Sequence, residues 1–156
     1  MKITDVLEEK FVRTKLPGST KEEIIGSMID LVAQSANVID KEKVRQAIFE
    51  REKIMSTGVG NGFAIPHGKT EAVKDIVAAF AVTERPVDYQ ALDDQPVRLV
   101  FLLVGKDSLV GPHIKLLSRI SRLMNKEGFR EALLTSKTAK DVLELFRQEE
   151  ASYFEG

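Results

Sequence analysis

The chain contains no cysteine among its 156 residues. This absence excludes a disulfide framework, a thiolate metal site and a cysteine nucleophile. The longest apolar runs, 76–82 and 99–104, are far shorter than the roughly 20 residues that a membrane-spanning helix needs. The first five residues also lack the apolar core of a secretory signal peptide. We therefore expect a cytoplasmic protein with no direct membrane insertion.

Charge of one sign is also lacking, because the net charge is only −1. Neither a basic run nor an aromatic-rich strand face occurs, so we expect no nucleic-acid partner. No internal repeat, low-complexity tract or linker divides the sequence, and its length suffices to bury most of its apolar surface. We expect a single domain over residues 1–156, with a core of about 3–148 and a polar, frayed tail from Glu149.

Apolar runs and turn residues predict the strands. Segments 11–16 and 63–65 are strand-like, and 75–83 and 97–104 are apolar without alternation. Lack of alternation is typical of strands that are buried on both faces. The segment 86–92, followed by a turn, resembles an edge strand.

Capping residues predict where the helices begin. Thr20 stands three residues before Glu23, which is the spacing of a capping box, and Asp40 and Thr138 precede two further helical patterns. Another helix is expected after Gly111-Pro112, and a short one over 129–134. Strands that alternate with helices indicate an α/β fold, here a single mixed β-sheet flanked by helices on both faces.

The segment Ser56 to Thr70 concentrates unusual residues: four of the ten glycines, one of the five prolines and one of the two histidines. Proline has a fixed backbone and biases Ile65 toward an extended conformation. His67 follows Pro66 directly, with the small and flexible Gly68 behind it. Histidine is the side chain whose charge changes near neutral pH. The segment therefore presents one imidazole in a defined place at a strand end.

Other chemistries fit this segment poorly. A dinucleotide fingerprint that starts at Gly58 needs a third glycine at position 63. A Walker loop that ends in Gly68-Lys69-Thr70 needs a glycine at the same position. Phe63 stands there, so the segment matches neither motif. A metal site would require His67, His113 and a third ligand that no spacing suggests. A Gly-x-Ser-x-Gly elbow is absent. Taken alone, a histidine near a helix start, such as His113, is more often a packing residue.

A presented imidazole without these partners suits covalent phosphoryl carriage. Such transfer needs alignment and positive charge. Arg51 and Lys69 could supply the charge. A second imidazole and the backbone amides near Pro112-His113 could also face the phosphoryl group. From the residues alone, two simpler interpretations stay open. The glycine-rich segment can be a tight turn without chemistry, and Arg51 can be a solvated charge that ends a helix. Further candidate phosphate ligands are the backbone amides of the glycine-rich loop: Gly58, Gly60, Asn61 and Gly62.

The stretch from Arg51 to Lys69, which includes Ser56-Thr57-Gly58 and Pro66-His67-Gly68, closely resembles the signature of the type-2 enzyme IIA domain. This is the fructose/mannitol-type phosphocarrier domain of the bacterial phosphoenolpyruvate-dependent sugar phosphotransferase system. Further matches occur at 92–97, 113–117 and 122–123, and the similarity spans roughly residues 3–146. Phe63 departs from the family, which usually has a smaller aliphatic residue there.

The resemblance implies a phosphotransferase in which His67 accepts phosphate from the phosphohistidine of HPr. It implies that His113 supports the reaction and that Arg51 stabilises the phosphoryl group, without a cofactor or metal. Sugar-system members pass the phosphate to a cysteine of enzyme IIB, whereas the nitrogen-regulatory enzyme IIA proteins act through partner binding and transport no known sugar. We lean to the fructose-like alternative. The sugar, the oligomeric state and the phosphorylated ring nitrogen stay open.

Overall fold

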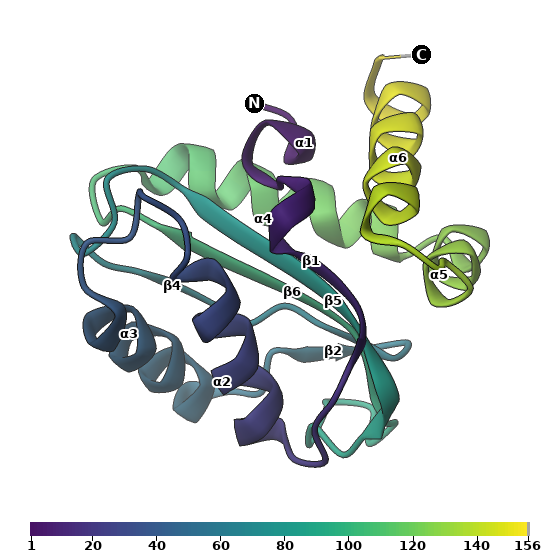
Figure 1. Cartoon of the computed structure of the whole chain (residues 1–156), viewed down its shortest axis with the longest axis horizontal. Coiled ribbons are helices and arrows are strands. Elements are labelled where there is room, and N and C mark those ends of the chain that lie inside the picture. The colour runs from purple at the N-terminus through teal and green to yellow at the C-terminus, as the bar shows by residue number, and fades with distance from the viewer. Residues whose placement is uncertain (156) are drawn as a thin grey trace.

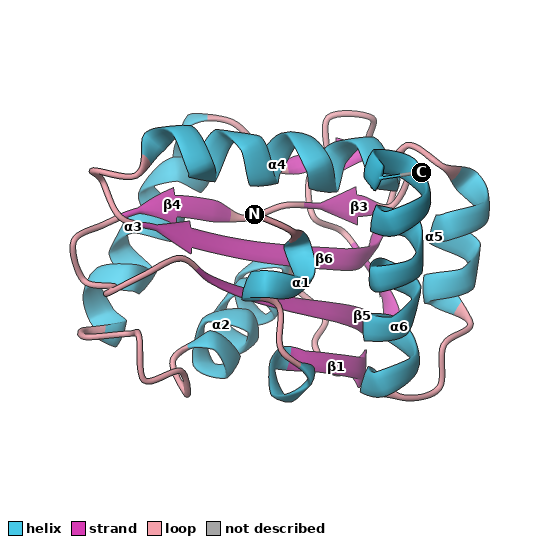
Figure 2. Cartoon of the chain, turned by 90° about the horizontal axis from the view of Figure 1, so that it is seen from above, coloured by secondary structure: helices cyan, strands magenta, loops and turns pink. Residues whose placement is uncertain are grey.

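Six strands form one mixed sheet in the computed structural model, which describes residues 1–155. The strand order is β1-β5-β6-β3-β2, and β4 pairs with β6 beyond β3 on the same edge (Figure 2). The β1–β5, β3–β6 and β4–β6 pairs are parallel, and the β5–β6 and β2–β3 pairs are antiparallel. The strands are β1 Val12–Leu16, β2 Gly58–Gly60, β3 Phe63–Ala64, β4 His67–Lys69, β5 Val77–Val87 and β6 Val97–Gly105.

Helices cover both faces of this sheet (Figures 1 and 2). One face packs against α2 and α3, and the other packs against α1, α4, α5 and α6. The predicted mixed sheet with helices on both faces is therefore confirmed. The helical elements are α1 Ile3–Val6, η1 Glu9–Phe11, α2 Lys21–Val32, α3 Lys41–Ile54, α4 Val110–Met124, α5 Glu127–Leu134, α6 Ala139–Glu150 and the π-helical turn η2 Ala151–Glu155.

Strands β5 and β6 form the centre of the molecule. Strand β6 and residues 77–83 of β5 are buried on both faces, as their apolar sequences predict. Side chains alternate between the faces: Ala79 and Ala81 point to the α2–α3 side, and Phe80 points to the other. There Phe80 meets Phe146 of α6 edge-to-face, with ring centroids 5.2 Å apart. Small residues on one face thus leave room for α2 and α3, while aromatic residues fill the opposite layer.

The predicted helix caps are confirmed. The Thr20 hydroxyl accepts a hydrogen bond from the Glu23 amide at 3.1 Å, which satisfies one of the free donors at the start of α2. Asp40 accepts bonds from two amides in the first turn of α3. Thr138 accepts one from Asp141 at 3.0 Å at the start of α6. Helix α4 begins earlier than expected, at Val110, so that Pro112 lies in the first turn, where its missing N–H is not needed.

The expected edge strand over 86–92 is wrong. Pro86 and Val87 are instead the end of the long central strand β5, whose register with β6 shifts between Val82 and Val87. This irregularity accommodates a proline, which cannot donate to a regular ladder. The following residues form a connection in which Tyr89 is completely buried.

The glycine-rich segment forms a tight hairpin rather than an open loop. Strands β2 and β3 are joined by Asn61 and Gly62, which both have positive φ angles, of 58° and 75°. Two consecutive positive φ values are what an Asn-Gly hairpin turn requires. The turn is held by Asp93, whose carboxylate accepts a hydrogen bond from the Asn61 amide at 3.0 Å.

The expectation of a frayed tail from Glu149 is also wrong. Helix α6 continues through Glu150, which is only 2% exposed. Its carboxylate accepts hydrogen bonds from the amides of Ile3 at 2.6 Å and Thr4 at 3.1 Å. The carboxyl end of α6 therefore lies beside the first turn of α1.

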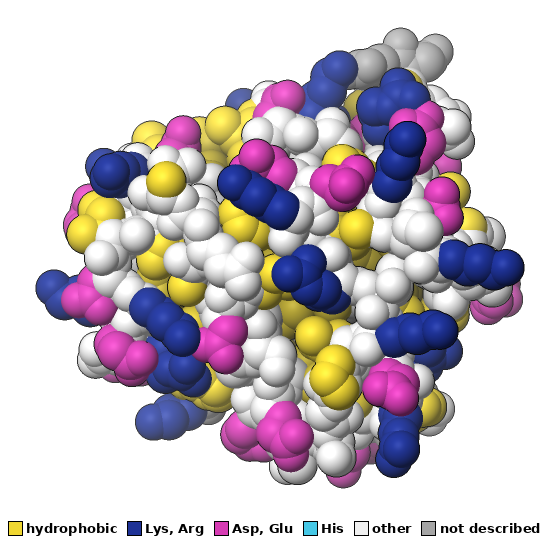
Figure 3. Space-filling view, in the orientation of Figure 1, with side chains coloured by type: hydrophobic (Ala, Val, Ile, Leu, Met, Phe, Trp, Pro, Cys, Tyr) yellow, Lys and Arg dark blue, Asp and Glu magenta, His cyan; other side chains and the backbone are white. Residues whose placement is uncertain are grey.

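The surface in Figure 3 carries charged side chains of both signs, interspersed without a block of either. Within residues 1–155, the helices are too short or too polar to cross a membrane.

Candidate active site

His67 opens strand β4 at the edge of the sheet, opposite Leu103 of β6. The neighbouring Pro66 carbonyl accepts a hydrogen bond from the Leu103 amide at 3.1 Å, which fixes the backbone just before the histidine. The His67 ring is only partly buried. The predicted presentation of an imidazole at a strand end is what the structure shows.

A single hydrogen bond orients the His67 ring. Nδ1 lies 2.7 Å from the carbonyl oxygen of Ile65. A carbonyl oxygen only accepts, so in the neutral ring Nδ1 carries the proton and Nε2 keeps its lone pair. The local chain thus leaves the lone pair of the neutral ring on Nε2.

The surroundings keep His67 neutral. Burial lowers its pKa below the ordinary value of 6.5, and the positive charges of Arg51 and Lys69 act in the same direction against the Ile65 hydrogen bond and Glu52, which raise it. A lowered pKa means that the ring is unprotonated at neutral pH. Cations close enough to lower this pKa are also placed to attract an anionic phosphoryl group.

Gly68 brings α3 against the strand that carries His67. A Cβ at this position would lie 3.2 Å from both the carbonyl carbon and the oxygen of Ala47, so the missing side chain permits close packing of β4 on α3. Arg51 follows Ala47 by four residues and therefore lies on the same face of the helix. Its NH1 group donates a hydrogen bond to the Met55 carbonyl at 2.9 Å.

His113 lies in the first turn of α4, and its ring lies close to the His67 ring. Its ring centroid lies 6.0 Å from that of His67, with the two rings inclined by 51°. The residue is only 3% exposed. Burial, followed by the charges of His67 and Lys69, lowers its pKa to about 4, so this ring is also neutral at pH 7.

A cavity of about 430 Å³ connects these groups. Arg51, His67, Lys69 and His113 line it, so four of the predicted site residues come together although they lie up to 62 positions apart. The cavity contains two neutral imidazoles and two cations, a set that can bind an anion beside a nucleophile. Its remaining lining residues are Ala47, Gly68, Asp107, Ile114 and Leu117.

The structure does not bring the glycine-rich hairpin into this cavity. Gly60 and Asn61 line a different cavity of about 150 Å³, near the far end of α4. Gly58 packs in the sheet, where a Cβ would lie 2.8 Å from that of Ala91, and Gly62 forms the hairpin turn. The four glycine-loop positions are therefore explained by close packing and by turn geometry.

Sequence reasoning missed the residues that hold the end of α3. Glu52, next to Arg51, is buried, and its carboxylate accepts hydrogen bonds from the amide and hydroxyl of Thr57. It also accepts a bond from the Tyr89 hydroxyl at 3.2 Å and pairs with Lys21 at 2.8 Å. This network fixes the turn after α3 and hence the Met55 carbonyl that Arg51 contacts.

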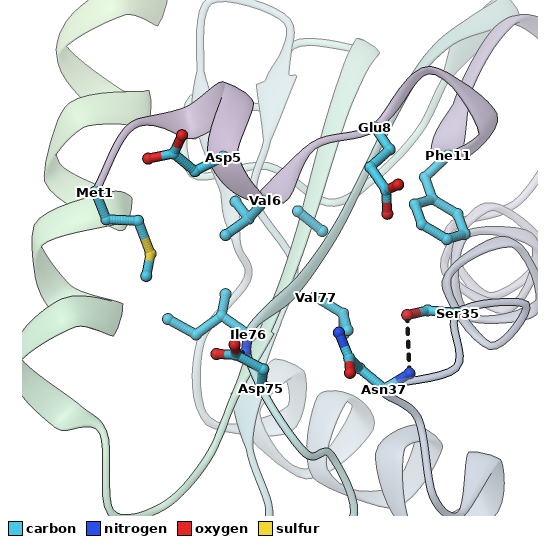
Figure 4. A pocket seen from close by; sticks show the side chains of 11 residues that line it. Met1, Asp5, Val6, Glu8, Phe11, Ser35, Asn37, Asp75, Ile76 and Val77 are labelled. Carbon is cyan, nitrogen blue, oxygen red and sulfur yellow. Dashed lines mark hydrogen bonds between the residues drawn. The ribbon is translucent and has the colours of Figure 1, made fainter.

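A cavity of about 140 Å³ elsewhere in the molecule lies between α1 and the start of β5 (Figure 4). Its acidic side chains include Asp5 and Asp75, which already accept hydrogen bonds from backbone amides. No histidine, lysine or arginine lines it, so it lacks the side chains that an anionic substrate needs. Within residues 1–155, no group of three or more His, Asp or Glu side chains is arranged to hold a metal ion.

The chain matches a known protein family over most of its length. The family described as "Phosphoenolpyruvate-dependent sugar phosphotransferase system, EIIA 2" matches residues 5–149. A match over nearly the whole chain makes this protein a phosphocarrier of that phosphotransferase system. Within this class, the chain belongs to the EIIA type-2 family.

Relatives in this family divide between two roles. The chain is 35% identical to the fructose-specific EIIA component of Haloferax volcanii, over 90% of this chain and 94% of that one. It is 33% identical to the nitrogen regulatory protein of Bradyrhizobium diazoefficiens, over 91% and 92%. It is also 33% identical to the fructose-specific EIIABC component of Bacillus subtilis, over 95% of this chain but only 23% of that much longer protein.

Solved structures show the same fold. The nitrogen regulatory protein IIA-Ntr of Neisseria meningitidis superposes with a TM-score of 0.86 at 30% identity, over 92% of this chain and 98% of that one. The mannitol enzyme IIA of Escherichia coli, solved in complex with phosphorylated enzyme IIB, superposes with a TM-score of 0.77 at 23% identity, over 92% and 99%.

Proposed function

We propose that this phosphocarrier accepts a phosphoryl group from phosphorylated HPr on Nε2 of His67. The observation that carries the proposal is the hydrogen bond from Nδ1 of His67 to the Ile65 carbonyl, which leaves the Nε2 lone pair free at the cavity. That lone pair attacks phosphorus as the phosphorus–nitrogen bond of the donor phosphohistidine breaks. The donor imidazole leaves with the electron pair of the broken bond.

The neighbouring groups assist by stabilising charge. As Nε2 gives its electron pair to phosphorus, the His67 ring becomes positive, and the Ile65 carbonyl dipole stabilises that charge through the Nδ1 proton. Arg51 and Lys69 face the negative phosphoryl oxygens, and His113 supports the transfer from the lining of the same cavity. Release to the next acceptor is the same step in reverse, with that acceptor in place of HPr.

The proposed acceptor is enzyme IIB of a fructose-like transport system. The fructose-specific relatives from Haloferax and Bacillus support this assignment. A second candidate is a regulatory role, in which the phosphorylation state of His67 controls the binding of partner proteins. The similarity to nitrogen regulatory proteins, including the Neisseria structure, favours this alternative.

The test is incubation with phosphoenolpyruvate, enzyme I and HPr, followed by mapping of the labelled residue. We expect label on His67 and none in a His67→Ala variant, whereas His113→Ala keeps the label site and accepts phosphate more slowly. Label in folded His67→Ala contradicts the assignment. Candidate enzyme IIB proteins are then added to the labelled protein. Loss of label to an enzyme IIB supports the transport role, and retention with every candidate supports the regulatory role.

A further inference from the structure

Gly105, the last residue of β6, lies against the ring of His113. A Cβ at Gly105 would be 2.7 Å from Nδ1 and 3.5 Å from Cγ of that ring. The first distance is shorter than real Cβ atoms show, so any side chain here must displace the imidazole. The φ angle of Gly105 is not positive, so backbone conformation does not require glycine at this position. The ring of His113 therefore occupies the space that a side chain at residue 105 would fill.

Apart from the cavity that it lines, the ring is closely surrounded by other groups. His113 is nearly fully buried, and its amide is tied to the Leu109 carbonyl at 3.3 Å in the first turn of α4. The His67 ring is a neighbour of the His113 ring, with the two ring centroids 6.0 Å apart. Gly105 is itself held in the sheet, where its carbonyl accepts a hydrogen bond from Thr70 at 2.9 Å. The contact thus joins two elements that are each fixed by other bonds.

The surroundings of Nδ1 also favour one tautomer of His113. Nδ1 is buried and has no hydrogen-bond partner in the described residues 1–155. A buried N–H without an acceptor is costly, so the favoured tautomer has its lone pair on Nδ1 and its proton on Nε2. Nε2 is then the nitrogen of His113 that can donate a hydrogen bond in the cavity. The lowered pKa of this ring agrees, because it keeps the second nitrogen unprotonated at pH 7.

We propose that Gly105 is a positioning residue for phosphoryl transfer. Because it has no side chain, the His113 ring stays at the cavity with its Nε2–H donor directed to the phosphoryl group. The inference rests on the proposed supporting role of His113. Gly105 itself touches neither His67 nor the phosphoryl group; it acts through the second imidazole. A methyl group at residue 105 should push the ring and turn its donor away from the phosphoryl oxygens.

A double-mutant cycle tests the proposal. The rate of transfer from phosphorylated HPr is measured for the wild type, Gly105→Ala, His113→Ala and the variant with both changes. We expect Gly105→Ala alone to slow transfer on the order of 10-fold or more, because small misplacements of a positioned group cost this much. With His113 already replaced by alanine, the methyl group has space, so Gly105→Ala should then cause no further loss.

Gly128→Ala on α5 is the matched control, because a Cβ there meets no atom within 4 Å. It should keep a rate within about twofold of the wild type. Ring nitrogen chemical shifts of His113 provide a readout that needs no transfer: the wild type should show the Nε2–H tautomer, and Gly105→Ala should change these shifts while the fold is retained.

Two results overturn the proposal: a wild-type rate in Gly105→Ala, or an equal loss from Gly105→Ala with and without His113. The second result would show that the methyl group acts on the fold and not through the imidazole. If the wild type takes no phosphate from HPr, the proposed function fails instead. The ring nitrogen shifts then still decide whether Gly105 sets the position and tautomer of His113.

Discussion

Arg51 lines the cavity with one of its several donors already in use. Its NH1 group binds the Met55 carbonyl at 2.9 Å, which leaves the other N–H groups of the planar guanidinium for an anion. A lysine keeps the charge but cannot hold the carbonyl and two phosphoryl oxygens in a fixed geometry. We predict that Arg51→Lys slows phosphoryl transfer about tenfold, or about 1.4 kcal/mol in barrier, in initial-rate labelling from phosphorylated HPr.

The matched control for this substitution is Arg45→Lys on the outer face of the same helix. Arg45 approaches Asp30 at 3.7 Å and Glu42 at 3.6 Å, at the surface and outside the cavity lining. Such surface pairs contribute about 0–1 kcal/mol, so this variant should transfer at the wild-type rate. Equal rates for Arg51→Lys and the wild type would remove the guanidinium from the proposed mechanism.

His113 also makes stability depend on pH. Burial lowers its pKa in the folded protein to about 4, from an ordinary value of 6.5. Between these two values the unfolded chain binds a proton that the folded chain does not, so stability is complete above pH 6.5 and falls as the pH drops toward 4. We predict that the free energy of unfolding, from urea denaturation, declines between pH 7 and 5 more steeply in the wild type than in His113→Asn.

The comparison of slopes isolates this residue, because His67 titrates in both proteins and its lowered pKa contributes to both in the same direction. Any pH-independent cost of the asparagine shifts the whole curve and leaves the slope unchanged. Parallel curves for the two proteins would show that the His113 ring is not held neutral by the fold.

At the scale of elements, the site depends on how closely α3 packs against β4. The contact at Gly68 is with the backbone of Ala47 and Ile48, at 3.2 to 3.3 Å from a would-be Cβ. Backbone cannot rotate aside as a side chain can, so an added methyl group must separate the helix from the strand. The two elements carry Arg51 and His67, and their separation therefore changes the reacting geometry as well as the packing.

We predict that Gly68→Ala lowers the free energy of unfolding by roughly 1 to 3 kcal/mol, which is the usual cost of overpacking. Phosphoryl transfer should slow at a temperature where the variant is still folded. Gly128→Ala adds the same methyl group in open space on α5, and alanine is the better helix former, so this variant should be as stable as the wild type or more so. Wild-type stability of Gly68→Ala would mean that α3 adjusts without strain.

The elements that sequence predicts well here are those with local signals. Thr20, Asp40 and Thr138 each satisfy amides within the first turn of their own helix, so the pattern contains the whole interaction. The edge strand expected over 86–92 failed because the apolar Tyr89 and Ala91 are buried against other elements and not in a ladder. The Asn61-Gly62 pair is a local hairpin signal of the same kind, because both residues adopt positive φ angles.

At the scale of the whole molecule, the sequence does not predict which polar groups from distant parts of the chain come into contact. Proline and glycine mark His67 locally, and the family signature includes Arg51 and His113. Glu52 lies in a charged stretch of α3 that is typical of a solvated face. Only the return of the chain at Thr57 and Tyr89 makes it a buried acceptor. Glu150 is likewise a buried acceptor, and its partners Ile3 and Thr4 lie much further away in the sequence.

Glu150 joins both ends of the chain to the helical layer that covers one face of the sheet. Besides the amides of Ile3 and Thr4, its carboxylate approaches Arg119 of α4 at 3.8 Å. Removing a buried acceptor leaves these partners unpaired. We predict that Glu150→Ala lowers the free energy of unfolding by roughly 2 to 3 kcal/mol. Glu149→Ala removes only the Lys126 pair near the surface and should cost less than about 1 kcal/mol.

The same pair of variants separates global stability from the chemistry of the site. Glu150 lies outside the cavity that contains His67, so Glu150→Ala should accept phosphate at the wild-type rate when assayed well below its melting temperature. A loss of transfer in the folded variant would instead indicate that the junction of the chain ends also sets the position of α4, and through it that of His113. Equal stability of the two variants would show that the buried carboxylate makes no larger contribution than a surface pair.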